Sequence, residues 1–212
     1  TKNLLDASIK HKVERFVLIS TDKAVAPVSV YGVSKMLCEK LVLDAANKTQ
    51  ENQAFMFVRF GNVLGSRGSL LPLFQEQIKN GGPVTITDEK MERFFMTIPE
   101  ACSLVLQVGG VGENGKSYLL DMGEPLKIID LAKQIIKFSG LEPEKDIEIK
   151  IVGARKGERL VEPLWLEEEN PTITEYKKIL KLTNKPYDSK RLQNLLDLLE
   201  PVCFYQENKK EF

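Results

Sequence analysis

The sequence predicts an α/β fold: a parallel sheet covered by helices, with a smaller α+β subdomain attached. Two short apolar segments, residues 13–20 and 54–60, have the composition of central strands covered on both faces. Between them, residues 31–47 carry apolar side chains at helical spacing. Strand, helix and strand in this order imply a right-handed crossover and a parallel pair.

The remaining elements follow from hydrophobic periodicity and from glycine and proline breaks. A helix over residues 3–10 precedes the first strand, and a polar loop over residues 20–29 follows it. Beyond a glycine-rich loop at 61–68 we expect helices at 70–79, 99–108 and 126–138, and strands at 84–87, 94–97 and 147–152, the last a half-exposed edge strand. From residue 166 onward we expect a peripheral tail with an amphipathic segment at 189–199.

Composition excludes several classes of protein. The 212 residues suffice for a domain with an appendage, and 30 basic and 30 acidic residues cancel, which argues against a nucleic-acid or polybasic membrane-surface protein. Three widely separated cysteines without metal-ligand spacing indicate reduced thiols and no metal site. No apolar run approaches the roughly 20 residues of a membrane span, and no signal peptide is evident, so we expect the chain as given to be soluble and cytoplasmic.

Tyr31 and Lys35 are the first candidate catalytic pair. They are four residues apart at the start of the predicted helix, so their side chains share one face. A nearby ammonium favours a phenolate and makes tyrosine a usable base. The same spacing also occurs by chance in amphipathic helices, and that alternative stays open. The only histidine, His11, lies in a turn and is not expected to be catalytic.

The loop before this helix carries Thr21, Asp22 and Lys23, which can donate, accept and carry protons. It leaves the carboxyl end of a buried strand, which is where ligands bind in open parallel sheets. Ordinary turn chemistry, with Asp22 capping the backbone and Lys23 solvated, is the alternative.

Several ordered motifs carry a family resemblance: residues 16–25 and 30–35, then 58–69, 93–98, 120–124 and 153–158. Over about residues 1–180 the chain resembles the nucleotide-sugar 4,6-dehydratases of bacterial polysaccharide biosynthesis, which are extended short-chain dehydrogenases. The run Thr21-Asp22-Lys23 is similar to the UDP-N-acetylglucosamine enzymes, whereas related dTDP-glucose dehydratases have Thr-Asp-Glu. The resemblance implies that residues 1–66 are the second half of a Rossmann-like domain with the catalytic loop and helix. It also implies that residues 67–180 mainly bind the nucleotide sugar, with 181–212 as a peripheral carboxy-terminal tail.

The resemblance further implies a redox-neutral elimination. Tyr31, helped by Thr21 and Lys35, takes the 4-hydroxyl proton while a hydride leaves C4. Lys23 then removes the C5 proton and Asp22 protonates the departing 6-hydroxyl, before the hydride returns to C6. Many large members have methionine where this chain has Tyr31, which leaves the stereochemistry at C5 open.

Substrate and cofactor contacts are also expected. A diphosphate needs cationic forks and backbone donors even in a neutral protein. The resemblance implies that Asn62, Arg67, Arg93, Arg155 and Glu158 bind the substrate. It implies that Tyr31 and Lys35 also contact NAD or NADP, and we assign Arg59, at the end of the second predicted strand, to the cofactor as well.

No glycine-rich dinucleotide turn follows a first strand in this sequence. We therefore expect the chain to be the carboxy-terminal part of an enzyme and to be inactive by itself. We expect the intact parent to be a homo-oligomer, and the resemblance to the large members implies an inner-membrane anchor in its missing amino-terminal half. A nucleotide-sugar 4-epimerase, which needs no Asp22–Lys23 acid and base, and a cofactor-less binding module remain alternatives.

Overall fold

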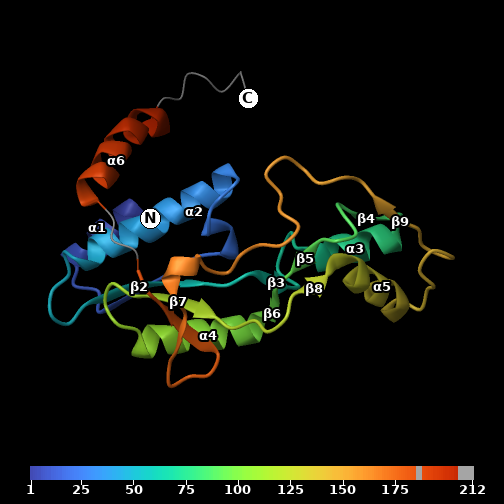
Figure 1. Ribbon diagram of the computed structural model, residues 1–212, viewed down its shortest axis with the longest axis horizontal. Coiled ribbons are helices and arrows are strands. Elements are labelled where there is room, and N and C mark those ends of the chain that lie inside the picture. The colour runs from blue at the N-terminus through green and yellow to red at the C-terminus, as the bar shows by residue number, and fades with distance from the viewer. Residues whose placement is uncertain (185–187, 205–212) are drawn as a thin grey trace.

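The computed structural model describes residues 1–184 and 188–204, with side chains through residue 202. Two lobes lie side by side along the long axis of the molecule (Figure 1). The larger lobe contains a five-stranded sheet in the order β1-β2-β7-β11-β10, and the smaller lobe contains short strand pairs with two helices.

The parallel part of the large sheet is built from β1 (Arg15–Ile19), β2 (Ala54–Arg59) and β7 (Ser117–Leu120). Helix α2 (Val30–Ala46) connects β1 to β2, as the strand-helix-strand pattern predicted. β11 (Ile179–Leu182) and β10 (Thr172–Ile173) extend the sheet in antiparallel orientation. The predicted α/β class and its parallel sheet are confirmed.

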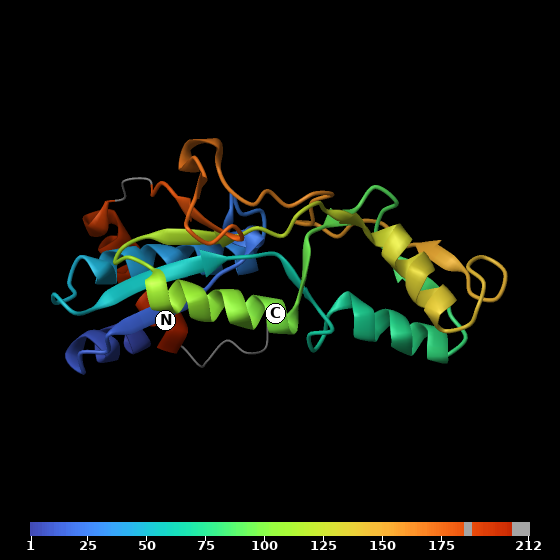
Figure 2. The same ribbon diagram turned by 90° about the horizontal axis from the view of Figure 1, so that it is seen from below.

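Helices cover both faces of this sheet because alternate side chains of β2 point in opposite directions. Phe55 and Phe57 join a core with α1 (Lys2–Lys10) and α2, whereas Met56 and Val58 join a core with α4 (Ile98–Val111). Figure 2, which views the molecule from below, shows α4 in front of the strands and α2 behind them. This two-sided burial explains the continuous apolar run of the strand.

The smaller lobe has a separate hydrophobic core between α3 (Leu70–Lys79) and α5 (Ile128–Phe138), with Phe74 and Ile136 fully buried. β4 (Val84–Ile86) pairs in parallel with β9 (Ile149–Ile151), and β5 (Glu92–Arg93) pairs antiparallel with β8 (Leu126–Lys127).

A parallel pair, β3 (Asn62–Leu64) with β6 (Phe95–Thr97), joins the lobes (Figure 1). Met96 belongs to the core of the large lobe, while Phe95 packs against that of the small lobe. The side chains of one short strand are thus shared between the two cores.

The division of the chain differs from the linear one expected at residues 66 and 180. Residues 95–120 and 172–182 return to the large sheet after the chain has entered the small lobe. Ile179 and Leu182 are buried beside β7, so the segment expected as a peripheral tail supplies two strands. Only pairing between distant residues reveals this arrangement.

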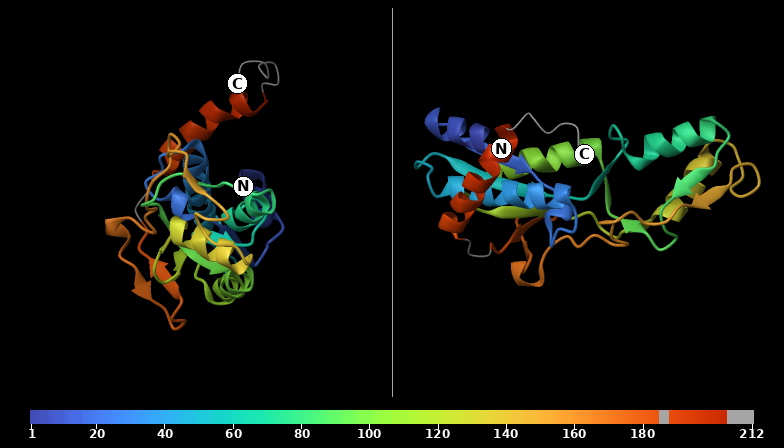
Figure 3. Two further views of the ribbon diagram at one scale, coloured as in Figure 1. Left: turned by 90° about the vertical axis from the view of Figure 1, so that its right-hand side faces the viewer. Right: turned by 90° about the horizontal axis from the view of Figure 1, so that it is seen from above.

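Beyond these strands, α6 (Ser189–Phe204) confirms the amphipathic segment expected at 189–199 and extends it. It lies at the end of the large lobe away from the small lobe (Figure 3). Within the described ranges, no helix is long and apolar enough to cross a bilayer. Cys38 and Cys102 are free thiols, and the side chain of Cys203 lies outside the described residues.

Candidate active site

The loop over residues 20–29, called the catalytic loop below because it carries the candidate residues 21–23, leaves the carboxyl end of β1 and runs beside the end of β2. The amide of Ser20 donates to the carbonyl of Val58 at 2.7 Å, and that of Asp22 donates to Phe60 at 3.3 Å. The loop then makes a single 3-10 turn, η1 (Asp22–Ala24), with Thr21 as its N-cap residue. These bonds fix the loop at the edge of the sheet where ligands bind in parallel α/β folds.

Thr21, Asp22 and Lys23 form one hydrogen-bond network. The hydroxyl of Thr21 donates to Oδ1 of Asp22 at 2.8 Å, and Nζ of Lys23 donates to the same oxygen at 3.1 Å. Nζ of Lys23 also approaches Oδ1 of Asn62 at 3.4 Å. The carboxylate is fully buried, whereas the lysine side chain is about one third exposed, at 32%. Lys23 therefore links a buried acid to the surface.

The second carboxylate oxygen of Asp22, Oδ2, is buried without a hydrogen-bond partner in the described part of the chain. Buried polar atoms normally have a partner, so one that lacks it calls for an explanation. A Cβ atom at Gly61 would stand 3.1 Å from this oxygen, so the glycine keeps the space beside it open. Oδ2 is thus the part of the network with unused hydrogen-bonding capacity.

Tyr31 and Lys35 lie in the first turns of α2, which begins at the N-cap residue Ser29. The hydroxyl of Ser29 accepts a hydrogen bond from the amide of Gly32 at 3.1 Å. Tyr31 is 55% exposed, and the ammonium of Lys35 donates to the carbonyl of Ile19 on β1 at 2.9 Å. The phenol is therefore accessible, and the lysine is held against the strand that carries the catalytic loop.

Gly32 joins helix α2 to the catalytic loop by close approach. A Cβ at this position would be 2.2 Å from the carbonyl oxygen of Lys23 and 2.9 Å from Cβ of Pro27. Since the first contact is with backbone, no side-chain rotation could relieve it. The glycine between Tyr31 and Lys35 is therefore required by packing, a reason that the sequence pattern alone does not give.

Arg59, assigned to the cofactor from the sequence, lies in a buried ion network instead. Its Nε and Nη2 atoms donate to Glu39 at 2.7 and 2.8 Å, and Nη1 donates to Glu169 at 2.8 Å. The hydroxyl of Ser20 also donates to Glu39, at 2.6 Å. Burial lowers the pKa of the Arg59 guanidinium, but the hydrogen bonds and charge of Glu39, and then of Glu169, outweigh it and raise that pKa.

This network is structural in its geometry. Arg59 is 5% exposed, and each of its three nitrogens donates to a glutamate, so its guanidinium faces the interior of the lobe. It ties the catalytic helix, through Glu39, to η2 (Glu167–Glu169) in the carboxy-terminal segment. Sequence reasoning missed Glu39 and Glu169, because a glutamate in an amphipathic helix or an acidic run normally faces solvent.

A cleft of about 680 Å³ lies between the lobes, beside the catalytic loop. All five residues expected to bind the substrate line it, together with Lys23 at its edge: Asn62, Arg67, Arg93, Arg155 and Glu158. Lys156 and Arg159 add further positive charge, against the two carboxylates of Glu158 and Glu162. A protein of zero net charge thus concentrates cations in this cleft, as a diphosphate site requires.

The lining residues differ in how available they are. Arg67 and Arg155 are exposed, whereas Arg93 is only 7% exposed and donates to the carbonyls of Glu92, Leu160 and Arg159 at 2.7 to 2.9 Å. The carboxylate of Glu158 accepts from the amide of Arg155 at 2.8 Å. Arg93 therefore supports the loop that follows β9 and contributes charge rather than a free fork.

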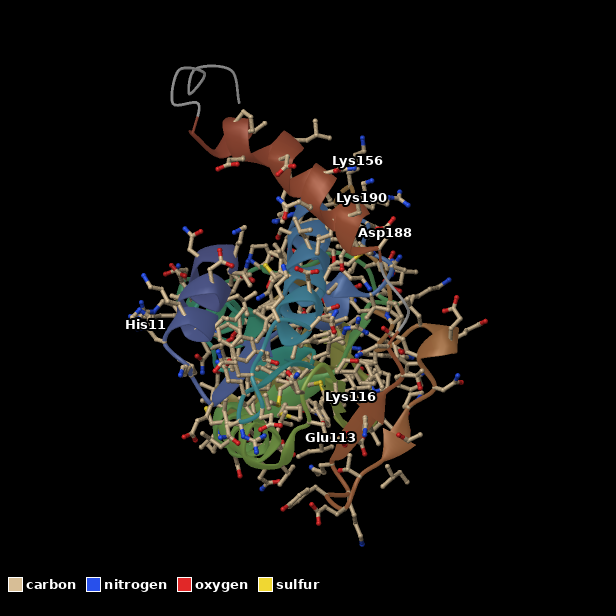
Figure 4. The ribbon with its side chains drawn as sticks, turned by 90° about the vertical axis from the view of Figure 1, so that its left-hand side faces the viewer. His11, Glu113, Lys116, Lys156, Asp188 and Lys190 are labelled. Atoms are coloured by element: carbon tan, nitrogen blue, oxygen red, sulfur yellow. The ribbon has the colours of Figure 1, made fainter. Side chains whose placement is uncertain are left out.

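Other candidates lie outside this cleft. Thr21, Asp22, Tyr31 and Lys35 are not among its lining residues, and Lys23 with Ser29 connects them to it. His11 is exposed and projects from the surface beyond α1 (Figure 4), and it is not among the residues that line the cleft. No cluster of three or more histidine, cysteine or acidic side chains suited to a metal occurs in the described part of the chain.

The parallel sheet, the tyrosine and lysine on its crossover helix and the loop at the carboxyl end of β1 define the extended short-chain dehydrogenase class. Within this class, a family model described as "Polysaccharide biosynthesis protein" matches residues 1–184. The chain belongs to this family.

Individual relatives support the assignment. The chain is 49% identical over 181 residues to the Capsular polysaccharide biosynthesis protein CapD of Staphylococcus aureus, covering 85% of this chain and 30% of that protein. It is 40% identical over 169 residues to a UDP-glucose 4-epimerase of Rickettsia canadensis, covering 79% of this chain and 48% of that protein. The chain thus spans less than half of either relative.

Among solved structures, Pen from Bacillus thuringiensis aligns with a TM-score of 0.77 at 29% identity, covering 94% of this chain and 66% of that one. DesIV of Streptomyces venezuelae, a dTDP-glucose 4,6-dehydratase with NAD and TYD bound, aligns with a TM-score of 0.68 at 22% identity. That alignment covers 77% of this chain and 55% of DesIV, and it shows a shared fold.

Proposed function

We propose that this chain carries the catalytic loop and substrate cleft of a nucleotide-sugar 4,6-dehydratase acting on a UDP-N-acetylglucosamine type of sugar. The observation that supports this most is the Asp22–Lys23 pair at the edge of a cation-rich cleft, with Nζ of Lys23 3.1 Å from Asp22. Loss of water across C5 and C6 requires a base for one proton and an acid for the leaving hydroxyl. This pair supplies both functions.

The cleft would hold the nucleotide end of the substrate. Arg67 and Arg155 are exposed along its walls and can reach diphosphate oxygens, and Asn62 presents an amide beside Lys23. A guanidinium matches two phosphate oxygens at once, which orients the substrate as well as attracting it. The sugar would then extend toward the Lys23 edge of the cleft.

Redox chemistry at C4 would use Tyr31 and Lys35. Tyr31 is exposed on α2 and Lys35 beside it is half-buried, and these two residues would hold the nicotinamide end of a dinucleotide. We leave Arg59 out of this role because its guanidinium is buried against Glu39 and Glu169. When bound, NAD or NADP supplies the hydride acceptor for C4 and the hydride donor for C6. Tyr31 takes the proton of the 4-hydroxyl, and the C4 ketone then acidifies the hydrogen at C5.

The catalytic loop would supply the base and the acid for the elimination. Lys23, in its neutral form, removes the C5 proton, and Asp22 gives a proton to the departing 6-hydroxyl, which leaves as water. Once C6 is reduced, the ammonium of Lys23 returns its proton to C5. Asp22 regains a proton from solvent and Tyr31 releases the proton of the 4-hydroxyl to solvent, so the protons balance. The hydrogen bond between Nζ of Lys23 and Oδ1 of Asp22 keeps the base and the acid together throughout. Thr21, which donates to Asp22, keeps this carboxyl oriented.

Binding of UDP tests the cleft directly and requires no turnover. Calorimetry with this chain should show UDP binding that weakens about tenfold to a hundredfold in Arg155→Met, the expected loss of a charged hydrogen-bonding group. Arg191→Met, an exposed arginine on α6, is the matched control and should bind as the wild type does. Absence of UDP binding, or equal binding by Arg155→Met, would contradict the proposed cleft.

A 4-epimerase is the second candidate, because the Rickettsia relative carries that name. The full-length protein that carries this chain should convert UDP-N-acetylglucosamine into a 4-keto-6-deoxy product, and Asp22→Asn should abolish that product. An epimerase would largely survive Asp22→Asn and would release a 4-epimer from the wild type. We also expect this chain without the rest of its parent to give no 4-keto product when NAD is added.

A further inference from the structure

The loop that follows β9 is fastened to the catalytic loop through Arg159. Its Nη1 atom donates to the carbonyl of Val25 at 3.3 Å, and its Nη2 atom donates to that of Ala26 at 2.5 Å. These carbonyls lie just after η1 and before the N-cap of α2. One side chain thus joins the segment carrying Arg155 and Glu158 to the segment carrying the acid, the base and Tyr31.

A second contact brings the same two segments together. Gly157 has φ +86°, and a Cβ there would stand 3.0 Å from the carbonyl oxygen of Val28 and 3.7 Å from Cβ of Ser29. Ser29 caps α2, two residues before Tyr31. The backbone between Arg155 and Arg159 therefore lies directly against the start of the catalytic helix.

The other side of the Arg159 segment is held by the small lobe. Arg93 on β5 donates to the carbonyls of Arg159 and Leu160, and the amide of Glu92 donates to Leu160 at 2.9 Å. Arg159 is thus anchored by its backbone to one lobe and by its guanidinium to the other. A displacement of this loop would therefore act on the hydrogen bonds that hold residues 25–26.

The receiving segment has a conformation that needs external support. Ala26 has φ +41°, in the left-handed region that residues other than glycine seldom occupy. Such a backbone persists only when its surroundings hold it in place. The hydrogen bond from Arg159 to the carbonyl of this residue is one such restraint.

From these contacts we infer that Arg159 is a positioning residue that couples occupation of the cleft to the order of the catalytic loop. A nucleoside diphosphate whose phosphates contact Arg155 and whose ribose contacts Glu158 fixes residues 155–159. Arg159 in turn fixes residues 25–29 ahead of Tyr31. Arg159 needs no contact with the reacting atoms for this role. The inference rests on the proposed nucleotide-sugar cleft and deepens it.

Hydrogen exchange of this chain at saturating UDP separates coupling from affinity. In the wild type, UDP should slow amide exchange in residues 153–160 and also in residues 24–33, where Gly32 and Val33 bond to Ser29. In Arg159→Met the first segment should remain protected, whereas the second should exchange as in the free protein. Arg159→Lys retains a donor and should restore part of the protection.

The outcomes distinguish the two proposals. Protection of residues 153–160 without protection of 24–33 in the wild type would overturn the coupling and leave the cleft standing. Unchanged protection of 24–33 in Arg159→Met would overturn the role of Arg159. Absence of protection in both segments would overturn the proposed function and the coupling together.

Steady-state kinetics of the full-length protein provide a second measurement. Arg159→Met should lower kcat about tenfold to a hundredfold, as expected for a misplaced catalytic group, with a smaller change in KM for the nucleotide sugar. Gly157→Ala, which presses on Val28 without removing a charge, should have the same kind of effect. A change confined to KM in both variants would show that these residues serve binding alone.

Discussion

The buried ion network at Arg59 allows a quantitative prediction. Arg59→Met removes three charged hydrogen bonds of 2.7 to 2.8 Å and leaves Glu39 and Glu169 buried without their cation. Deleting one partner of a buried ion pair costs about 3–5 kcal/mol. Because Glu39 keeps a donor in Ser20 and Glu169 keeps the amide of Leu166, we expect the lower end of that range.

Urea unfolding of this chain, followed by circular dichroism, measures this loss. With a total stability of about 5–15 kcal/mol for a typical domain, a loss of about 3 kcal/mol would move the midpoint markedly without changing the slope. Glu39→Gln in the Arg59→Met background removes one unpaired carboxylate and should recover part of the loss, giving a coupling of about 1 kcal/mol or more. A loss below about 1 kcal/mol, the value of an exposed pair, would refute the reasoning.

The raised pKa of Arg59 also predicts how the folding stability depends on pH. A group whose pKa is raised on folding stabilises the protein below its unfolded pKa and loses that effect as the pH rises through the folded value. Since the pKa of Arg59 is raised from an already strongly basic value, its contribution should not titrate at neutral or acidic pH. The wild-type guanidinium therefore remains charged wherever the unfolding is measured.

Two further substitutions test the packing around the site. Gly32→Ala would place a Cβ 2.2 Å from the carbonyl oxygen of Lys23, so urea unfolding should show a loss of stability of about 1–3 kcal/mol. The same variant of the full-length protein should have a lower kcat. Stability and rate equal to those of the wild type would contradict the close approach. Phe74→Ala leaves a cavity in the core of the small lobe and should lower stability by about 3–5 kcal/mol in urea unfolding. It should also weaken UDP binding. A loss of stability with unchanged UDP binding would show that the cleft does not depend on this core.

Local pattern was sufficient for the elements that begin the chain. β1, α2 and β2 each bury a continuous or periodic apolar set, so their type and order could be predicted before the structure. The strands β7, β10 and β11 were not expected, because they are four residues long or shorter and depend on pairing with distant segments. Residues 179–182 in particular gain their burial from β7, a partner that no local window contains.

For the site, the sequence indicated which residues lie together but not the direction of every side chain. The resemblance collected Asn62, Arg67, Arg93, Arg155 and Glu158 from separate motifs, and the structure brings all of them to one cleft. The resemblance could not show that the guanidinium of Arg93 donates to backbone carbonyls. The side chain of Arg59 turns inward because two buried glutamates from distant parts of the chain compensate its charge. Side-chain direction at the end of a strand depends on such partners, which sequence spacing does not record.

The shared strand pair between the lobes has a mechanical consequence. The polypeptide passes from one lobe to the other at residues 65–69, 93–95, 121–125 and 152–166, so neither lobe is a continuous segment. A single hinge would let one lobe swing freely, whereas here any rotation must bend all of these connections together (Figure 2). The cleft therefore lies between lobes that are joined by several strands of chain and not by a single hinge. Neither lobe can be cut away by one truncation without removing strands from the other.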